Sequence, residues 1–443
     1  MAPKPAVFPA GGCQDTPFWW PQPAPSVDRA SQEGGIVDGP LSAAADVLII
    51  GAGYTGLSAA VATARGGRRT VVVDAAAAGW GCSTRNGGHV STSIKPTLEQ
   101  LARKFGHERA RRILMEGRNA RRWIEDFIAR EKIDCDFKCC GRFHGAHNAR
   151  AFKKLCRQIE SEPDGLESGA WPVARGEQRG EIGSDFYHGG AVFPHVASVD
   201  PARYHRGLLH CAKNAGAEIV THCAAHGIKR EGGGFTVATA RGTVRAREVV
   251  VATNGYTGGV TPWLRRRVIP VGTYIIATEE LDAARIKELL PTGRVITDTR
   301  KLVYYYRASP DGRRLLFGGR VLLKESAPMA SAPRLFDAMT RIFPQLKDAR
   351  VTHCWGGTVA FTFDALPHCG RRGGVHYAMG YCGSGVSLAS YFGARTGQKI
   401  LGRREGQTAL DGLPFPARFW YTGTPWFLAP AVSFYRWRDR AGW

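Results

Sequence analysis

The segment DVLIIGAGYTGL, residues 46–57, decides the fold of this 443-residue chain. It opens with a short apolar run at 47–50, of the kind that forms a buried strand in a parallel sheet. A Gly-x-Gly-x-x-Gly pattern follows, and then small residues that suit a helix over 54–64. A second β-branched run, TVVVD at 70–74, completes a βαβ unit of about 30 residues.

The glycine pattern has little weight alone, because the chain contains 55 glycines and the pattern arises by chance. Its place between a strand and a helix gives it meaning. Gly51 permits the tight turn, Gly53 lets the backbone approach a pyrophosphate, and Gly56 allows the helix to pack closely. The segment therefore predicts a dinucleotide site.

The same βαβ unit also supplies the groups that would bind the phosphates and the ribose of a dinucleotide. The helix begins near Tyr54 and Thr55, where free N–H groups and the helix dipole favour phosphate. Asp74, at the end of the second strand, can accept hydrogen bonds from both ribose hydroxyls and would repel a 2′-phosphate. NADP is therefore disfavoured, and NAD and FAD stay open at this point.

The rest of the chain alternates helices and strands. We expect a helix over 98–130 interrupted at Gly106 and Gly117, and a second one from Asp200-Pro201 to about Asn214. Strand-like segments at 268–278, 302–307 and 315–319 predict antiparallel pairing, and hence two interleaved domains. The N-terminal 1–42 is rich in Pro and Gly, and its aromatic residues at 18–20 are expected to lie on the folded body.

Composition narrows the function classes. The formal net charge is +22, but the basic residues are scattered, so no nucleic-acid partner is expected. Eleven cysteines show no metal-ligand spacing, so no metal is predicted. The odd cysteine count and the lack of a secretory signal predict a cytoplasmic protein. The uncharged stretch at 47–64 is too rich in glycine and hydroxyl residues for a good membrane span.

Six motifs, including the opening segment, resemble the D-amino-acid-oxidase-like FAD-dependent oxidoreductases, specifically their gamma-glutamylputrescine oxidase branch. They are ADVLIIGAGYTGLS at 45–58, GCSTRNGG at 81–88, ATNGYT at 252–257, YYR with RLLFGGR at 305–307 and 314–320, WGG before TFDALP at 355–357 and 362–367, and GYCGSGV at 380–386. The resemblance covers about residues 16 to 435, and the motifs occur in the order and spacing of the family.

This resemblance implies an α/β fold, α+β overall, in which a Rossmann-like FAD-binding domain is interleaved with a substrate domain built on a mixed or antiparallel sheet. The implied FAD-binding domain is 43–95, 196–260 and 351–405; the substrate domain is 96–195 and 261–350; 406–443 is a C-terminal segment. The implied FAD-contacting residues are Gly51, Gly53, Tyr54, Thr55, Gly56, Asp74, Ser83, Arg85, Asn86, Gly87, Gly88, Ala225, Asn254, Gly380, Tyr381, Gly383, Gly385 and Val386.

Departures from the family pattern carry further expectations. Some relatives attach FAD through a His or a Cys, and these places fall on Asn86 and Gly357, so dissociable FAD is expected. Two lysines that monomeric sarcosine oxidase uses for oxygen and for the substrate carboxylate fall on Leu316 and Ser387.

Two active-site places of the family fall on Tyr305 and Arg320. Arg307 shares a strand face with Tyr305, so both could reach the pocket, and Tyr305, Arg307 and Arg320 are the candidate catalytic residues. The alternative is cross-strand packing for Tyr305 and a surface charge for Arg307. His89, His195 and His353 are assigned no role.

The implied reaction is oxidation of an amine by hydride transfer to flavin N5, giving an imine, an aldehyde and hydrogen peroxide, with molecular oxygen as acceptor. The substrate would be gamma-glutamylputrescine or a related primary or secondary amine. One alternative is an amino-acid or imino-acid dehydrogenase that passes electrons to a quinone or carrier. Another is a non-catalytic protein that binds flavin or nucleic acid.

Overall fold

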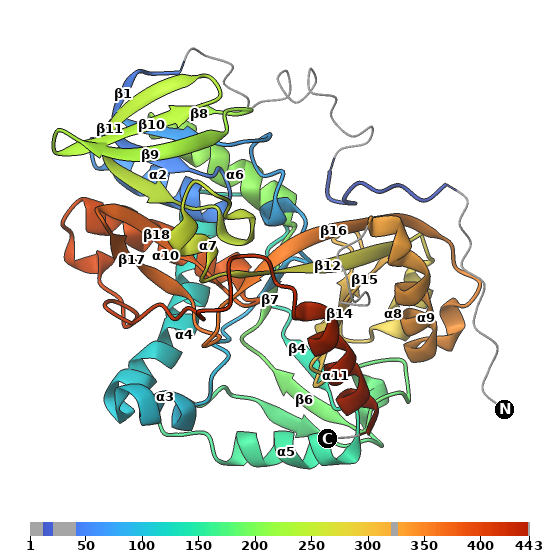
Figure 1. The fold of residues 1–443 in the computed structure, drawn as a ribbon. Helices are drawn as coiled ribbons and strands as arrows, with labels where there is room; N and C mark the ends of the chain where they lie inside the picture. Colours follow the sequence, from blue (N-terminus) through green and yellow to red (C-terminus); the bar gives the residue numbers. More distant parts are fainter. Residues whose placement is uncertain (1–11, 21–40, 320–326, 442–443) are drawn as a thin grey trace.

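Two large sheets organise the computed structural model, which describes residues 12–20, 41–319 and 327–441 (Figure 1). One is the parallel sheet that the βαβ unit predicts, and the other is mostly antiparallel. Their strands come from alternating stretches of the chain, so the expected interleaved α/β architecture is confirmed.

The parallel sheet contains β1, the strand of the segment at 46–57. Its strands in spatial order are β17 (His368–Arg372), β18 (Val375–Met379), β11 (Gly242–Val251), β1 (Ala44–Ile50), β2 (Thr70–Val73) and β8 (Glu218–Val220), with β10 (Gly234–Thr239) and β9 (Ala225–Glu231) beside β11. Strand β1 pairs in parallel with both β11 and β2. A central strand is covered on both faces, which explains why residues 47–50 are apolar without alternation.

Helices cover the parallel sheet. They include α2 (Tyr54–Arg65), α6 (Pro201–Asn214) and α10 (Gly385–Ile400). The predicted start of α6 is confirmed, because Asp200 caps it by accepting from the N–H groups of Ala202 and Arg203.

The second sheet pairs its neighbouring strands antiparallel, except for β13 and β4. Its order is β16 (Val351–Phe361), β12 (Ile269–Thr278), β15 (Leu315–Gly319), β14 (Tyr304–Ala308), β13 (Val295–Asp298), β4 (Arg142–Gly145), β6 (Gly190–Phe193) and β5 (Trp171–Val173). Other elements are α5 (Ala149–Glu160), α7 (Pro262–Arg265), α8 (Ala283–Leu289), α9 (Ala332–Ile342), α11 (Leu428–Ala441), and the short strands β3 (His89–Val90) and β7 (Ala197–Ser198).

The helical region at 98–130 differs in part from the expectation. It divides at Gly106, where φ is +79°, into α3 (Leu98–Phe105) and α4 (His107–Arg130). Helix α4 runs through Gly117 without interruption. A Cβ at Gly117 would lie 2.0 Å from the Thr92 carbonyl oxygen, so this glycine serves close packing rather than a break.

The expected domain boundaries stay a prediction. Two segments, however, pack with the other domain than the one to which they were assigned. Strand β16, placed with the FAD-binding segments, pairs along its length with β12 in the antiparallel sheet. Helices α3 and α4, placed with the substrate segments, pack in the same hydrophobic core as β1 and α2. Strand β16 thus belongs to the antiparallel sheet, and α3 and α4 belong to the core around β1 and α2, which sequence periodicity alone does not reveal.

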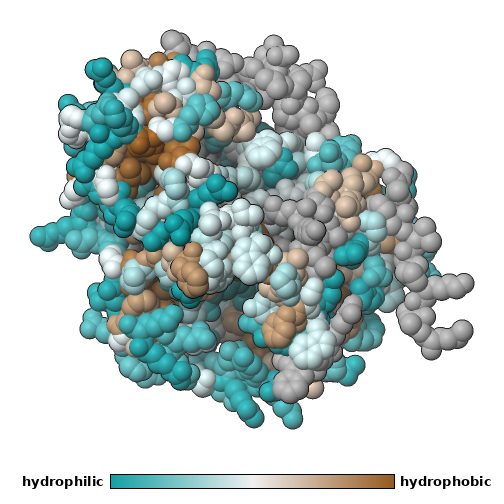
Figure 2. All heavy atoms as spheres, in the orientation of Figure 1, coloured by the Kyte–Doolittle hydropathy of each residue, from teal (hydrophilic) through white to brown (hydrophobic). Residues whose placement is uncertain are grey.

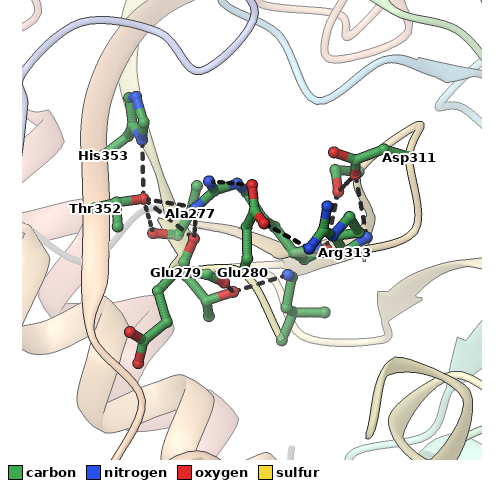
Figure 3. Close-up of polar contacts among 11 residues, drawn as sticks. Ala277, Glu279, Glu280, Asp311, Arg313, Thr352 and His353 are labelled. Atoms are coloured by element: carbon green, nitrogen blue, oxygen red, sulfur yellow. Dashed lines mark hydrogen bonds and ion pairs between the residues drawn. The ribbon is translucent and has the colours of Figure 1, made fainter. Parts of the chain in front are cut away.

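The described part of the N-terminal segment, 12–20, lies on the folded body as expected. Gln14 exchanges backbone hydrogen bonds with Thr352 and Cys354 on β16. Phe18 packs edge-on against His353, and Trp19 is buried. The same edge of the sheet is held by polar contacts in which the Thr352 hydroxyl lies between the Ala277 carbonyl and His353 (Figure 3).

The surface drawn in Figure 2 is mostly hydrophilic, with small separate apolar patches. Across the described residues, no helix combines the length and apolar character that a membrane crossing requires. The same residues contain no cluster of three or more His, Cys, Asp or Glu side chains suited to a metal ion.

Gly117→Ala should destabilise the protein, although alanine is intrinsically better in a helix than glycine by about 1 kcal/mol. The added methyl would collide with the Thr92 carbonyl, and overpacking typically costs about 1–3 kcal/mol. Thermal unfolding checks this, with Asn119→Ala in the same helix as the control that raises helix propensity without a close contact. An unchanged or higher midpoint for Gly117→Ala would contradict the packing role.

Candidate active site

A cavity of about 1680 Å³ is lined by residues from both sheets. It exceeds the ~300–1,000 Å³ usual for a single small ligand, so it has room for a dinucleotide and a substrate together. Most of the residues implied in FAD binding line it: Gly51, Gly53, Tyr54, Thr55, Asp74, Ser83, Arg85, Asn86, Gly87, Ala225, Asn254, Tyr381, Gly383, Gly385 and Val386.

At one end, the turn after β1 brings backbone against the cavity. Gly51 has φ +111°, and a Cβ there would lie 2.9 Å from the Ala252 carbonyl oxygen. A Cβ on Gly56 would lie 1.8 Å from the Gly51 carbonyl oxygen. Gly56 therefore acts in packing α2 onto the turn and does not itself line the cavity.

Helix α2 begins beside the cavity with Gly53 as its N-cap and no acidic residue in its first turn. The side-chain hydroxyls of its first two residues are hydrogen-bonded within the protein. The Tyr54 hydroxyl donates to the Pro201 carbonyl at 2.9 Å, and the Thr55 hydroxyl bonds the Tyr381 hydroxyl at 2.7 Å. Backbone N–H groups and the positive end of the helix dipole are thus what this end presents to a phosphate.

Asp74 is held in place by the backbone around the same turn. Its two carboxylate oxygens accept from the N–H groups of Ala52 at 2.7 Å and Ala76 at 2.9 Å. Burial raises the pKa of this carboxyl above its ordinary value. Each oxygen keeps a lone pair for a further donor, so a ribose diol can bind here. These features fit an adenine dinucleotide.

The loop at 83–88 lies between the nucleotide end and the antiparallel sheet. The Ser83 hydroxyl accepts from the Tyr54 N–H at 3.0 Å. The Asn86 side chain closes its own loop, donating to the carbonyls of Cys82 and Ser83 and accepting from the Gly88 N–H. A Cβ on Gly88 would lie 2.2 Å from the Val199 carbonyl oxygen, so Gly88 packs behind the cavity wall.

Three tryptophan side chains contact the loop at 83–88 and hold it in position. Arg85 lies between the rings of Trp20 and Trp80, at 4.8 and 4.9 Å from their centroids. The indole N–H of Trp19 donates to the Asn86 carbonyl, and that of Trp20 donates to the Thr84 hydroxyl. The N-terminal segment therefore holds the wall of the cavity, a role that its aromatic composition alone did not specify.

The motif at 380–386 forms the opposite wall. Asn254 accepts from the Gly380 N–H at 2.9 Å, which joins the ends of β11 and β18. A Cβ on Gly380 would lie 2.3 Å from the Thr362 side chain, so Gly380 also packs behind the wall. Gly383, Gly385 and Val386 line the cavity at the start of α10, whose N-cap makes no side-chain hydrogen bond.

The implied catalytic residues are placed differently from one another. Tyr305 lines the cavity beside Gly87, and burial raises the pKa of its phenol, which stays protonated. Arg307 does not line the cavity: its guanidinium donates to the carbonyls of Val199 and Ala308, both at 2.9 Å. Arg307 lies two residues after Tyr305 on β14, behind the part of the cavity wall that Gly88 and Val199 form. Sharing a strand face with Tyr305 is therefore not sufficient to bring Arg307 into the cavity. Arg320 lies outside the described residues.

Lys95, Arg142 and His144 line the cavity without having been predicted from the sequence, and His89, which was assigned no role, lines it as well. Burial, with nearby positive charges, lowers the pKa of both histidines to about 3, so they are uncharged at neutral pH. Arg142 and His144 alternate with the core residue Phe143 in β4. That alternation is visible in the sequence, but it does not show which face of the strand meets a cavity.

The two positions that correspond to the lysines of sarcosine oxidase, Leu316 and Ser387, carry uncharged side chains. Leu316 is buried in a hydrophobic cluster, and the Ser387 hydroxyl donates to the Ser91 carbonyl at 2.8 Å.

Comparison with known proteins agrees with this geometry. The model of the FAD dependent oxidoreductase family matches residues 46–398. The chain is 33% identical over 410 residues to a probable oxidoreductase OrdL of Rhizobium meliloti, covering 90% of this chain and 94% of that one. It is 31% identical over 404 residues to gamma-glutamylputrescine oxidoreductase of Escherichia coli, covering 90% and 93%.

Among solved structures, the crystal structure of glycine oxidase from Geobacillus kaustophilus matches with a TM-score of 0.70 and 19% identity, covering 85% of this chain and 99% of that one. At that identity the likeness concerns the fold. The match of the family model over most of the chain agrees with the glycine turn, the carboxylate after β2 and the large shared cavity: this chain belongs to the FAD-dependent oxidoreductase family.

Proposed function

We propose that the chain binds FAD without a covalent bond and oxidises an extended amine, of which gamma-glutamylputrescine is the leading example. The N-termini of α2 and α10, the Asp74 carboxylate and the loop at 83–88 would hold the cofactor. When bound, FAD supplies a hydride acceptor for the carbon that carries the nitrogen. The resulting imine hydrolyses to an aldehyde, and dioxygen as final acceptor gives hydrogen peroxide.

The observation that carries this proposal is the extent of the cavity. From the loop at 83–88 it continues past Tyr305 to His144 and Arg142 on β4, so it leaves room for a long substrate beyond the cofactor loop. Full-length similarity to a gamma-glutamylputrescine oxidoreductase supports a long substrate. The neutral Leu316 and Ser387 argue against the carboxylate grip used for small amino acids.

Side chains of the cavity would prepare the amine for oxidation. The reaction needs an uncharged nitrogen, and burial away from water disfavours the protonated form of a bound amine. His89 lies beside Tyr305 and is itself kept neutral by burial. The protonated Tyr305 hydroxyl can donate to or accept from the substrate.

A substrate screen tests the function. Extended primary amines such as gamma-glutamylputrescine should exceed sarcosine, glycine and D-alanine in kcat/KM by about tenfold or more, a difference of ~1.4 kcal/mol in transition-state binding. Peroxide formation and reduction of a quinone analogue should be measured side by side. Faster turnover of any small amino acid, or turnover with the quinone analogue alone, would favour the amino-acid dehydrogenase alternative.

Heat or acid should release intact FAD into the supernatant. Asn86 and Gly357 replace the attachment residues of relatives, and Cys82, whose sulfur lies 3.5 Å from where a Gly357 Cβ would be, has a pKa raised by burial to about 11. A protonated thiol is a weak nucleophile. Absorbance of the supernatant and of the precipitate is the measurement, with Cys82→Ser as the companion variant. Colour that stays with the wild-type precipitate and is released in Cys82→Ser would overturn the prediction and identify the attachment.

Asp74→Ala should raise the FAD dissociation constant by about tenfold to a hundredfold, because a charge-assisted hydrogen bond to ribose is lost. Titration of the apoprotein followed by flavin fluorescence measures this. Asp185→Ala, which removes an exposed carboxylate paired with Arg179, is the matched control. Equal affinity in Asp74→Ala and wild type would contradict the ribose role.

A further inference from the structure

Arg142 occupies a distinctive place in the cavity. Strand β4 directs Phe143 into the hydrophobic core, while Arg142 and His144, on the other face, line the cavity. The Arg142 guanidinium lies over the Phe193 ring, 4.6 Å from its centroid, which holds the side chain in position.

No described residue forms a hydrogen bond or an ion pair with the Arg142 side chain, whose Nε is buried without a partner. Desolvation alone lowers the pKa of this guanidinium, to about 10, so it stays charged at neutral pH. A buried charge without a counter-charge destabilises a protein unless a ligand supplies one.

Other buried arginines near the cavity differ in this respect. Arg300 is paired with the buried carboxylate of Asp298, and Arg307 donates to two main-chain carbonyls. The three carboxylates that line the cavity are likewise occupied: Asp74 by backbone N–H groups, Asp298 by Arg300, and Asp364 by Thr362 and His368. Arg142 therefore has no acid left to pair with among them.

A second positive charge lies close by. Lys95 also lines the cavity, and the charge of Arg142 contributes to lowering the pKa of both Lys95 and His144. No carboxylate offsets these effects at either residue, and at Lys95 the Cys382 thiol alone acts in the opposite direction. The pair forms a positively charged end of the cavity that suits a carboxylate, which a guanidinium binds with two parallel hydrogen bonds.

The sheet register sets the distance of this end from the cofactor loop. Tyr305, which contacts Gly87, pairs with Thr297 on β13, and Thr297 pairs with His144 on β4. Two strand spacings of about 4.8 Å therefore separate Tyr305 from His144, roughly 10 Å in all. Arg142 lies two residues farther along β4.

We propose that Arg142, assisted by Lys95, binds a carboxylate at the end of the substrate remote from the oxidised carbon, and so selects amines that carry a distal carboxylate. This inference rests on the proposed amine oxidation and names its substrate class. A small amino acid cannot place its carboxylate here and its reacting carbon beside Gly87 at the same time.

The test compares Arg142→Met with wild type on two substrates of matched reacting end. Gamma-glutamylputrescine carries the distal carboxylate, and N-acetylputrescine lacks it. KM for gamma-glutamylputrescine should rise by about tenfold to a hundredfold with kcat little changed, because a charged hydrogen-bonded contact is lost. KM for N-acetylputrescine should stay within about twofold, since its contacts are retained. Arg142→Lys should recover part of the loss, because it keeps the charge without the two-pronged geometry.

Calorimetric binding of glutarate to the FAD-loaded protein provides a readout that needs no turnover, and its affinity should fall in Arg142→Met. Arg350→Met, which removes an exposed positive charge paired with Glu279, is the control and should behave as wild type. Equal changes of KM for both amines, or unchanged glutarate affinity in a folded Arg142→Met or Arg142→Lys, would overturn the inference. If wild type oxidises no amine, the proposed function fails, while the glutarate titration still decides the carboxylate site.

Discussion

The close approach of helix α2 to the end of strand β1 is the constraint on which the rest of the site depends. Gly56 lies so near the Gly51 carbonyl that a methyl group at 56 has no room. Helix α10 approaches α2 in the same way, because a Cβ at Gly393 would lie 2.2 Å from the Thr55 carbonyl oxygen. These contacts bring two helix N-termini to one cavity, where their dipoles add to the attraction for an anionic cofactor.

The two sheets contribute different chemistry to that cavity. The parallel sheet ends in backbone N–H groups and one carboxylate, which suits a nucleotide. The antiparallel sheet presents side chains, with Tyr305, Thr297 and His144 in one row across three strands. The loop at 83–88 lies between them, and the tryptophans of the N-terminal segment fasten it from outside. A segment remote in sequence thus stabilises the wall that both ligands would share.

Two arginines near the cavity, Arg307 and Arg142, differ in whether their charged side chains have partners within the protein. Arg307 satisfies main-chain carbonyls and closes the wall behind Gly88. Arg142 is partly buried, and its side chain has no described hydrogen-bond or ion-pair partner, so its charge is available to the cavity. Burial keeps His89 and His144 neutral, so the positive charge in this part of the cavity comes from Arg142 and Lys95.

The sequence by itself determined the βαβ unit, the glycine turn, Asp74, the cap of α6 and the family, because each depends on local spacing or on motifs in order. It also indicated the interleaved domains. Only the tertiary structure decided that Gly117 packs against Thr92, that Arg307 turns away from the cavity, and that Arg142 enters it. Strand periodicity specifies which residues share a face, but what that face meets depends on contacts between segments far apart in the chain. The contacts of the N-terminal tryptophans and the pairing of β16 with β12 were likewise decided by packing between segments far apart in the chain.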